Sequence, residues 1–185
     1  MRWERLFDDL TAAFDAADAD ALEAEVAERI RSELAATSLE DRLRGAIGMR
    51  VACGVRGAGR VAGVVRQVGQ GWLVVDEPVS STTIVATSAV VGVWQLPVVA
   101  RSAAGCGPAV AGLGLGHVLR VLARDRTPLS IALVDGSGFT GTVDRVGADY
   151  ADIAEHPLDV LRRRDTVTMT RTLAFAAVAV LRPIR

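Results

Sequence analysis

Apolar and polar residues alternate with a period of two over most of the chain after residue 47, as they do in half-buried β-strands. Turns such as Gly57-Ala58-Gly59 and Asp135-Gly136-Ser137-Gly138, whose residues tolerate positive φ, separate the alternating segments. The short strands and hairpin connections favour small antiparallel barrels over a doubly wound sheet. The expected strands are about Arg50–Arg56, Gly59–Gln67, Trp72–Glu77, Thr82–Ala86, Val90–Gln95, Leu129–Val134, Gly138–Arg145, Tyr150–Glu155, Thr166–Leu173 and Val178–Pro183.

Helical periodicity predicts one long helix over residues 2–36 and two short helices, Ser38–Ile47 and Leu115–Arg124. The long helix is acidic, and a kink is expected near Asp18–Asp20. Its apolar stripe is typical of a helix that packs on a sheet edge or pairs with a partner, and we favour self-association. The stripe consists of Trp3, Phe7, Leu10 and Phe14, followed by Leu22, Val26, Ile30 and Leu34.

The chain repeats when it is read against itself at an offset of 78 residues, which places Leu43–Val75 over Val121–Ile153. Gly63 then falls on Gly141, and Trp72 falls on Tyr150. An internal repeat of this length indicates two copies of one structural unit. The expected domains are an acidic helix (1–37), a first barrel (38–96), an Ala/Gly/Pro linker (97–114) and a second barrel (115–185).

The order of the expected elements and the sequence pattern of the strands resemble those of a known family. A short helix precedes five strands in each copy, and Gly63–Gly69 and Gly141–Gly147 match a Gly-x-hydrophobic signature in strand two. The chain thus resembles the Sm/LSm-like barrel proteins, and Arg2–Leu10 is similar to an uncharacterised actinobacterial family. The resemblance implies a mainly β fold with α: a long N-terminal helix, then two Sm-like five-stranded antiparallel β-barrels, each preceded by a short helix.

Members of that family bind RNA, but their binding residues are not found here. The family's Asp falls on Gly69 and Gly147, and its Asn falls on Leu73 and Ala151. Its Arg-Gly pair falls on Ala86-Thr87 and on about Ala174-Phe175. These residues cannot supply the base-edge hydrogen bonds of sequence-selective RNA reading. The resemblance therefore implies a fold and no inherited RNA site.

Charge is divided unevenly along the chain. Residues 1–37 hold ten acids and four Arg, net −6, whereas residues 38–185 hold 17 Arg and 12 acids, net +5. This asymmetry indicates a partner of opposite charge, or one part of the chain packing on another. We expect no secretory signal or membrane span, and Cys53 and Cys106 form no disulfide framework, so a reducing cytoplasm is predicted.

Arginines in the expected loops are the strongest candidates for ligand binding, because guanidinium groups contact phosphate backbones without reading bases. We favour the simpler interpretation that these loops are solvated or paired with acids. Trp72, Tyr150 and Trp94 are either stacking platforms or core residues, and we expect core. The arginines are Arg56, Arg60, Arg66, Arg145, Arg162, Arg163, Arg164 and Arg171, with Arg162–Arg164 in an insertion at about Pro157–Asp165.

No pattern of catalytic, cofactor-binding or metal-ligating residues is recognisable in the chain. His117 and His156 lack zinc-site spacing with the two cysteines, and each is expected at the surface or at a helix start. Gly112–Gly116 reads as linker or helix entry and not as a dinucleotide loop. We therefore predict that no catalytic residue, cofactor or metal is present.

These observations favour a non-enzymatic, cytoplasmic binding or scaffold module. It would bind a protein partner or its own copy through Trp3, Phe7, Leu10 and Phe14 of the helix and through the barrel edges. The alternative is sequence-independent RNA or DNA binding through the arginine-bearing loops. Neither hypothesis involves a membrane.

Overall fold

A computed structural model of the chain describes residues 21–78, 81–101, 112–157 and 169–184. The chain divides into two units, Met1–Ser38 and Leu39–Arg185. In the first unit residues 21–36 are helical, as predicted for that part, and the predicted residues 2–20 lie outside the described residues. The second half of the apolar stripe, from Leu22 to Leu34, is exposed on this helix.

The described residues of the second unit form two short α-helices, two 3-10 helices and ten strands. Three strands, Trp72–Glu77, Tyr150–Glu155 and Val178–Pro183, have the predicted bounds, and so does the helix Leu115–Arg124. The elements in order are α2 (Leu39–Gly45), β1 (Arg50–Val55), β2 (Gly59–Gly69), β3 (Trp72–Glu77), β4 (Ser81–Ala86), η1 (Thr87–Ala89), β5 (Val90–Trp94), α4 (Leu115–Arg124), β6 (Pro128–Leu133), β7 (Gly138–Val146), β8 (Tyr150–Glu155), β9 (Met169–Ala174), η3 (Phe175–Ala177) and β10 (Val178–Pro183).

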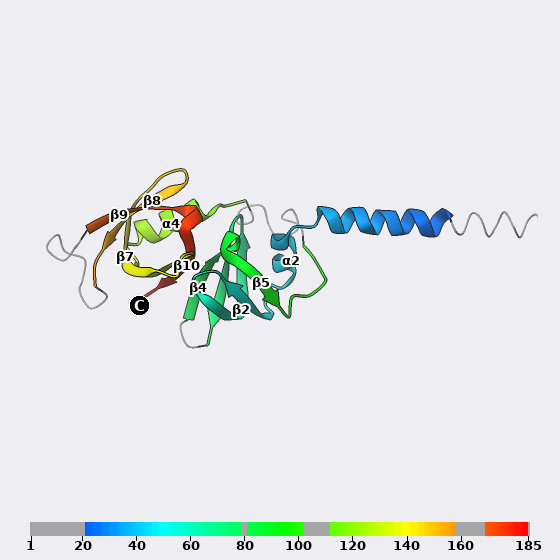
Figure 1. Cartoon of the computed structure of the whole chain (residues 1–185), viewed down its shortest axis with the longest axis horizontal. Coiled ribbons are helices and arrows are strands. Elements are labelled where there is room, and N and C mark those ends of the chain that lie inside the picture. The colour runs from blue at the N-terminus through cyan, green and yellow to red at the C-terminus, as the bar shows by residue number, and fades with distance from the viewer. Residues whose placement is uncertain (1–20, 79–80, 102–111, 158–168, 185) are drawn as a thin grey trace, which may run out of the picture. The chain divides into compact units, whose positions relative to one another are not determined.

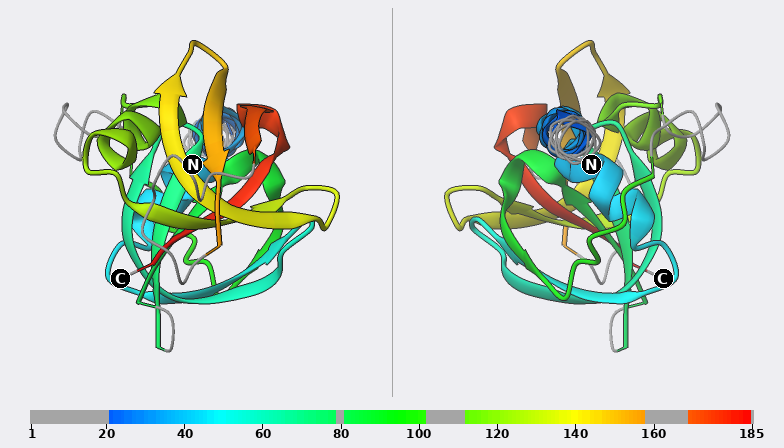
Figure 2. Two further views of the ribbon diagram at one scale, coloured as in Figure 1. Left: turned by 90° about the vertical axis from the view of Figure 1, so that its left-hand side faces the viewer. Right: turned by 90° about the vertical axis from the view of Figure 1, so that its right-hand side faces the viewer.

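All ten strands belong to one antiparallel sheet, in the order β5-β1-β2-β3-β4-β10-β6-β7-β8-β9. Strands β4 and β10 are neighbours in this sheet (Figure 1). The prediction of a long helix followed by two separate Sm-like barrels is therefore wrong. The strands bend strongly (Figure 2), yet among the described residues the sheet does not close into a barrel. The sequence repeat does not mark two separate structural units, because β4 and β10 join the strands into a single sheet.

The junction between β4 and β10 places Val180 opposite Val85 and Leu181 opposite Ile84. Side chains also cross this junction. Val180 packs in a core cluster with residues of β1 to β4, whereas Ile84 packs in a second cluster with residues of β6 to β10. The two clusters interlock at β4 and β10, which explains why Leu39–Arg185 forms one compact unit.

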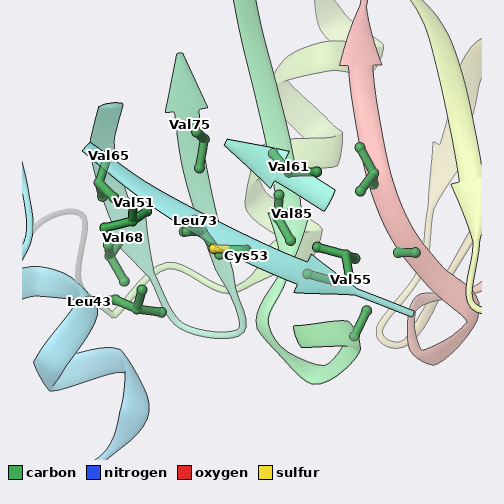
Figure 3. Close-up of a cluster of buried hydrophobic side chains, with 14 of the residues drawn as sticks. Leu43, Val51, Cys53, Val55, Val61, Val65, Val68, Leu73, Val75 and Val85 are labelled. Atoms are coloured by element: carbon green, nitrogen blue, oxygen red, sulfur yellow. The ribbon is translucent and has the colours of Figure 1, made fainter. Parts of the chain in front are cut away.

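The first core cluster is filled by Val, Leu and Cys53 from the concave sheet and closed by Leu43 of α2 (Figure 3). The carboxylate of Glu40, also on α2, fixes the helix to the sheet. Its Oε1 accepts a hydrogen bond from the Gly71 N–H at 2.7 Å and another from the Thr87 hydroxyl at 3.2 Å. Arg44, nearly fully buried, donates to Asp41 at 2.7 Å and so keeps its charge paired.

The second cluster is closed by Leu115 and Leu119 of α4, a helix that packs on β7. Gly114 is the N-cap of α4, which confirms the helix-entry interpretation of the glycine-rich segment. No helix in the described part of the chain is long and apolar enough to cross a membrane.

Candidate interaction site at the edges of the sheet

The two free edges of the sheet are β5 and β9, each with one neighbour among the described strands. On β5, Val91 is 73% exposed and Trp94 is 57% exposed. The strand reads Val-Val-Gly-Val-Trp and carries no charged residue. Edge strands usually carry charge or proline, which prevents pairing with another chain. β5 therefore presents an unprotected, partly apolar edge.

The other edge, β9, is more polar. Its Arg171 forms an ion pair with Glu155 of β8, and its guanidinium carbon lies 4.4 Å from the ring centre of Phe139. The Thr172 hydroxyl donates a hydrogen bond of 2.7 Å to Asp152. The guanidinium of Arg171 thus lies beside the Phe139 ring on an edge strand. On its outer side, the backbone of β9 has no partner among the described strands.

The predicted phosphate-binding arginines lie on several elements. Arg56 is exposed in the β1–β2 turn, and Arg60 on β2 lies with its guanidinium carbon 5.9 Å from the Trp94 ring centre. Arg66 is paired with Asp76 at 2.5 Å, and Arg145 is exposed on β7. Arg162, Arg163 and Arg164 lie outside the described residues, as do Trp3, Phe7, Leu10 and Phe14 of the predicted partner-binding helix.

The aromatic residues divide between core and surface. Trp72 is buried, as predicted, and its Nε1 donates to the Leu113 carbonyl at 2.7 Å. The core prediction is wrong for Trp94, which lies on the free β5 edge, and for Tyr150, which is 43% exposed. Tyr150 lies over Gly147, where an added Cβ would come within 2.3 Å of its ring. A glycine beside an aromatic residue was thus a packing signal.

Two polar networks, one partly buried and one buried, were missed by the sequence analysis. The carboxylate of Glu77 accepts a hydrogen bond from Thr83 at 2.5 Å and lies 3.5 Å from Arg182. His156 is 4% exposed, so its predicted surface position is wrong. Its Nε2 lies 2.7 Å from the Thr142 hydroxyl and its Nδ1 lies 3.0 Å from the Pro157 carbonyl. The carbonyl requires a proton on Nδ1, so Thr142 donates to Nε2 in the neutral ring.

The remaining candidates support no reaction centre. His117 is exposed, as predicted, at the rim of an apolar cavity of about 300 Å³ between α4, β2 and β3. Cys53 is fully buried, and burial raises the pKa of its thiol to about 11. Asp135 shapes the β6–β7 turn, where hydrogen bonds from the Ser137 hydroxyl and N–H lower its pKa. Within the described ranges, His, Cys, Asp and Glu do not gather into a metal-binding group.

No protein-family model, curated protein or solved structure matches the chain.

Proposed function

We propose that this chain is a non-enzymatic, cytoplasmic binding module that associates with copies of itself through the free edges of its sheet. The observation that carries the proposal is β5, an edge strand without charge and with Val91 and Trp94 exposed. Its outward N–H and C=O groups provide a template for another strand, and its side chains provide apolar area to bury.

The hydrogen bonds of the buried Thr83 and Thr142 side chains support a binding function over a catalytic one, because these groups contribute to the stability of the fold. The buried Thr83 hydroxyl donates a hydrogen bond to Glu77, which also forms an ion pair with Arg182, and the buried Thr142 is hydrogen-bonded to His156. Hydrogen bonds of this kind stabilise and specify a fold. The absence of catalysis, cofactor and metal remains a prediction.

The helix of residues 21–36 offers a second apolar surface. Leu22, Val26, Ile30 and Leu34 recur every four residues, and each is about half exposed or more. A helix of this length is marginal in water without packing of its apolar face. A helical contact with a protein partner or a second copy thus remains part of the proposal.

Nucleic-acid binding is the second candidate, and fewer observations support it. Arg66 and Arg171 are ion-paired and Arg60 lies near Trp94, while Arg56 and Arg145 are exposed on different elements. Measurement of fluorescent RNA and DNA binding over a salt series tests it. Binding whose affinity falls steeply with salt, and which is lost when Arg162, Arg163 and Arg164 are replaced by Ala, would favour nucleic acid. Absence of binding by the intact chain at low salt excludes this function.

The test of self-association is the mass of the full chain by sedimentation equilibrium, from micromolar to near-millimolar concentration. The average mass should exceed the 19.5 kDa of one chain and rise with concentration. Val91→Lys places a charge on the β5 edge and should weaken association by about tenfold or more. Val121→Lys, on the exposed face of α4, is the matched control and should leave association unchanged. A wild-type mass of one chain at every concentration contradicts the proposal.

A further inference from the structure

We infer that the apolar cavity between α4 and the β2–β3 hairpin binds a small organic carboxylate. The apolar body of the ligand lies inside the cavity, and its carboxylate lies at the mouth. The volume of about 300 Å³ is at the lower end of the range of small-ligand pockets, which is about 300–1,000 Å³. This ligand site is separate from the free sheet edges, so it does not depend on self-association.

The walls of the cavity continue the second core cluster outward. Trp72 of β3 is buried in that cluster, and Val74 of the same strand packs against it. From the opposite wall, Val118 and Leu122 of α4 pack against the same cluster. All four side chains also line the cavity. Water finds few hydrogen-bond partners in such a space, whereas an apolar molecule gains contacts with hydrocarbon and with an indole ring.

The two walls are fixed to each other at one end of the cavity. The carbonyl of Leu113, which precedes α4, accepts a hydrogen bond of 2.7 Å from the Trp72 indole and one of 3.1 Å from the Gln70 N–H. Gln70 and Gly114 also form a β-bridge. The cavity is therefore preformed, and a ligand would lose little affinity to the ordering of the protein around it.

Two polar side chains line the cavity from opposite walls, Gln67 of β2 and His117 in the first turn of α4. Neither side chain makes a hydrogen bond to another described residue. The glutamine amide is a donor, and an imidazole donates from one ring nitrogen when neutral and from both when protonated. Both side chains can thus donate to the oxygens of a single head group.

The charge distribution favours an anionic head group over a cationic one. None of the described residues that line the cavity is acidic, and α4 contains no acid. A ligand ammonium would therefore lack a counter-charge here. A carboxylate accepts two or more hydrogen bonds, and those that it accepts are stronger than bonds between neutral groups. A carboxylate is therefore the head group that matches Gln67 and His117.

The test is a titration of the full chain followed by two-dimensional ¹H–¹⁵N NMR, with three probes that share one alkyl chain. Hexanoate carries the carboxylate, 1-hexanol is its neutral counterpart and hexylamine its cationic one. Hexanoate should bind with a Kd of roughly 1 mM or tighter. The binding of 1-hexanol should be about tenfold weaker, since it lacks charge-assisted hydrogen bonds, and that of hexylamine weaker still.

The same spectra locate the site without any substitution. The amide signals of Val74, Val118 and Val121 should shift as hexanoate is added, because these residues line the cavity. The signal of Val91, on the distant edge strand β5, should not shift.

Variants separate the apolar part of the site from its head-group contacts. Val121→Phe places a larger side chain at the exposed mouth and should weaken binding of hexanoate and 1-hexanol alike, by about tenfold or more. Val98→Phe, at another exposed valine, is the matched control and should leave binding unchanged. His117→Ala and Gln67→Ala should each weaken hexanoate binding by about threefold to tenfold, but should leave 1-hexanol binding within about twofold.

Each part of the inference can fail separately. Absence of shifts at hexanoate concentrations of about ten times the expected Kd overturns the ligand site. Equal affinities for hexanoate and 1-hexanol overturn the recognition of a carboxylate. Shifts that fall outside α4, β2 and β3 overturn the location, and this result holds even if Val121→Phe does not fold.

Discussion

Arg182 of β10 lies with its Nε 3.5 Å from Oε1 of Glu77, the last residue of β3. Strand β4 lies between these two strands in the sheet, so the ion pair spans it. The same carboxylate oxygen accepts a 2.5 Å hydrogen bond from Thr83, a β4 residue with no exposed surface. One acidic side chain therefore satisfies a buried hydroxyl and a guanidinium at the junction that makes the sheet continuous.

Replacement of Glu77 by Ala should destabilise the chain, because it leaves the Thr83 hydroxyl and the Arg182 guanidinium without their carboxylate. The expected loss in the free energy of unfolding is about 1–3 kcal/mol, measured by urea denaturation. Asp125→Ala is the control, since the Asp125–Arg124 pair is exposed. Its loss should be at most about 0.5 kcal/mol. Equal losses for the two variants would show that Glu77 does not serve the junction.

Two glycines in one hairpin separate backbone strain from packing. Gly57 and Gly59 both have φ of +73°, so an Ala at either position carries the same conformational cost, about 1–2 kcal/mol. At Gly57 an added Cβ would also lie 1.9 Å from the Leu133 carbonyl oxygen, whereas at Gly59 it meets nothing within 4 Å. Gly57→Ala should therefore lower the free energy of unfolding clearly more than Gly59→Ala does.

Denaturant unfolding of the two variants gives their losses in free energy of unfolding. The comparison tests whether the β1–β2 hairpin contacts the β6–β7 hairpin, which belongs to the strands on the other side of the β4–β10 junction. If both variants lose the same stability, the hairpin of Gly57 does not press against Leu133 in solution.

The sequence was sufficient to locate the strands but not to join them. Periodicity of two reports which face of a strand is buried, and it placed Trp72–Glu77 and Tyr150–Glu155 correctly. It does not report which strand is the neighbour of another in the sheet, because backbone hydrogen bonds between strands produce no periodic pattern in the amino-acid sequence. The resemblance to separate barrels then supplied a wrong partner arrangement. The non-local pairing of Val180 with Val85 and of Leu181 with Ile84 shows that the sheet continues.

A signal for the junction was present in the sequence. Val178–Leu181 is a continuous apolar run, and all four residues are buried, as is usual for a strand covered on both faces. The edge strand β9 instead mixes Thr and Arg with its apolar residues. A comparison of β10 with β9 on this basis would have assigned one to the interior of a sheet and the other to an edge. The burial of His156 left no comparable pattern.

The hydrogen bond between Thr142 and His156 should contribute measurably to stability. Thr142→Val keeps the shape of the side chain but removes the hydroxyl that donates to Nε2, in a site where Thr142 is 1% exposed. The expected loss is about 1–3 kcal/mol in the free energy of unfolding. Thr172→Val, which removes an exposed hydroxyl bonded to Asp152, is the control and should change little. A loss no larger than that of the control would argue against the buried bond.

The thiol of Cys53 should be inert in the folded chain. It has no exposed surface, and its pKa of about 11 leaves almost no thiolate at neutral pH. In a Cys106→Ser chain, a thiol-specific reagent should label Cys53 only as fast as the chain unfolds, and rapidly in concentrated urea. Rapid labelling of the folded chain would contradict this burial.

The same raised pKa predicts how stability depends on pH. The thiol has an ordinary pKa of 9.0, so the unfolded chain loses this proton at a lower pH than the folded chain does. The contribution of the neutral thiol is fully present below pH 9.0 and is lost as the pH rises through about 11. As the pH rises from 9.0 to about 11, the Cys106→Ser chain should therefore lose free energy of unfolding relative to its Cys53→Ala derivative, which has no thiol at this position. A difference that stays constant from pH 9.0 to about pH 11 would mean that the Cys53 thiol is not desolvated in the folded chain.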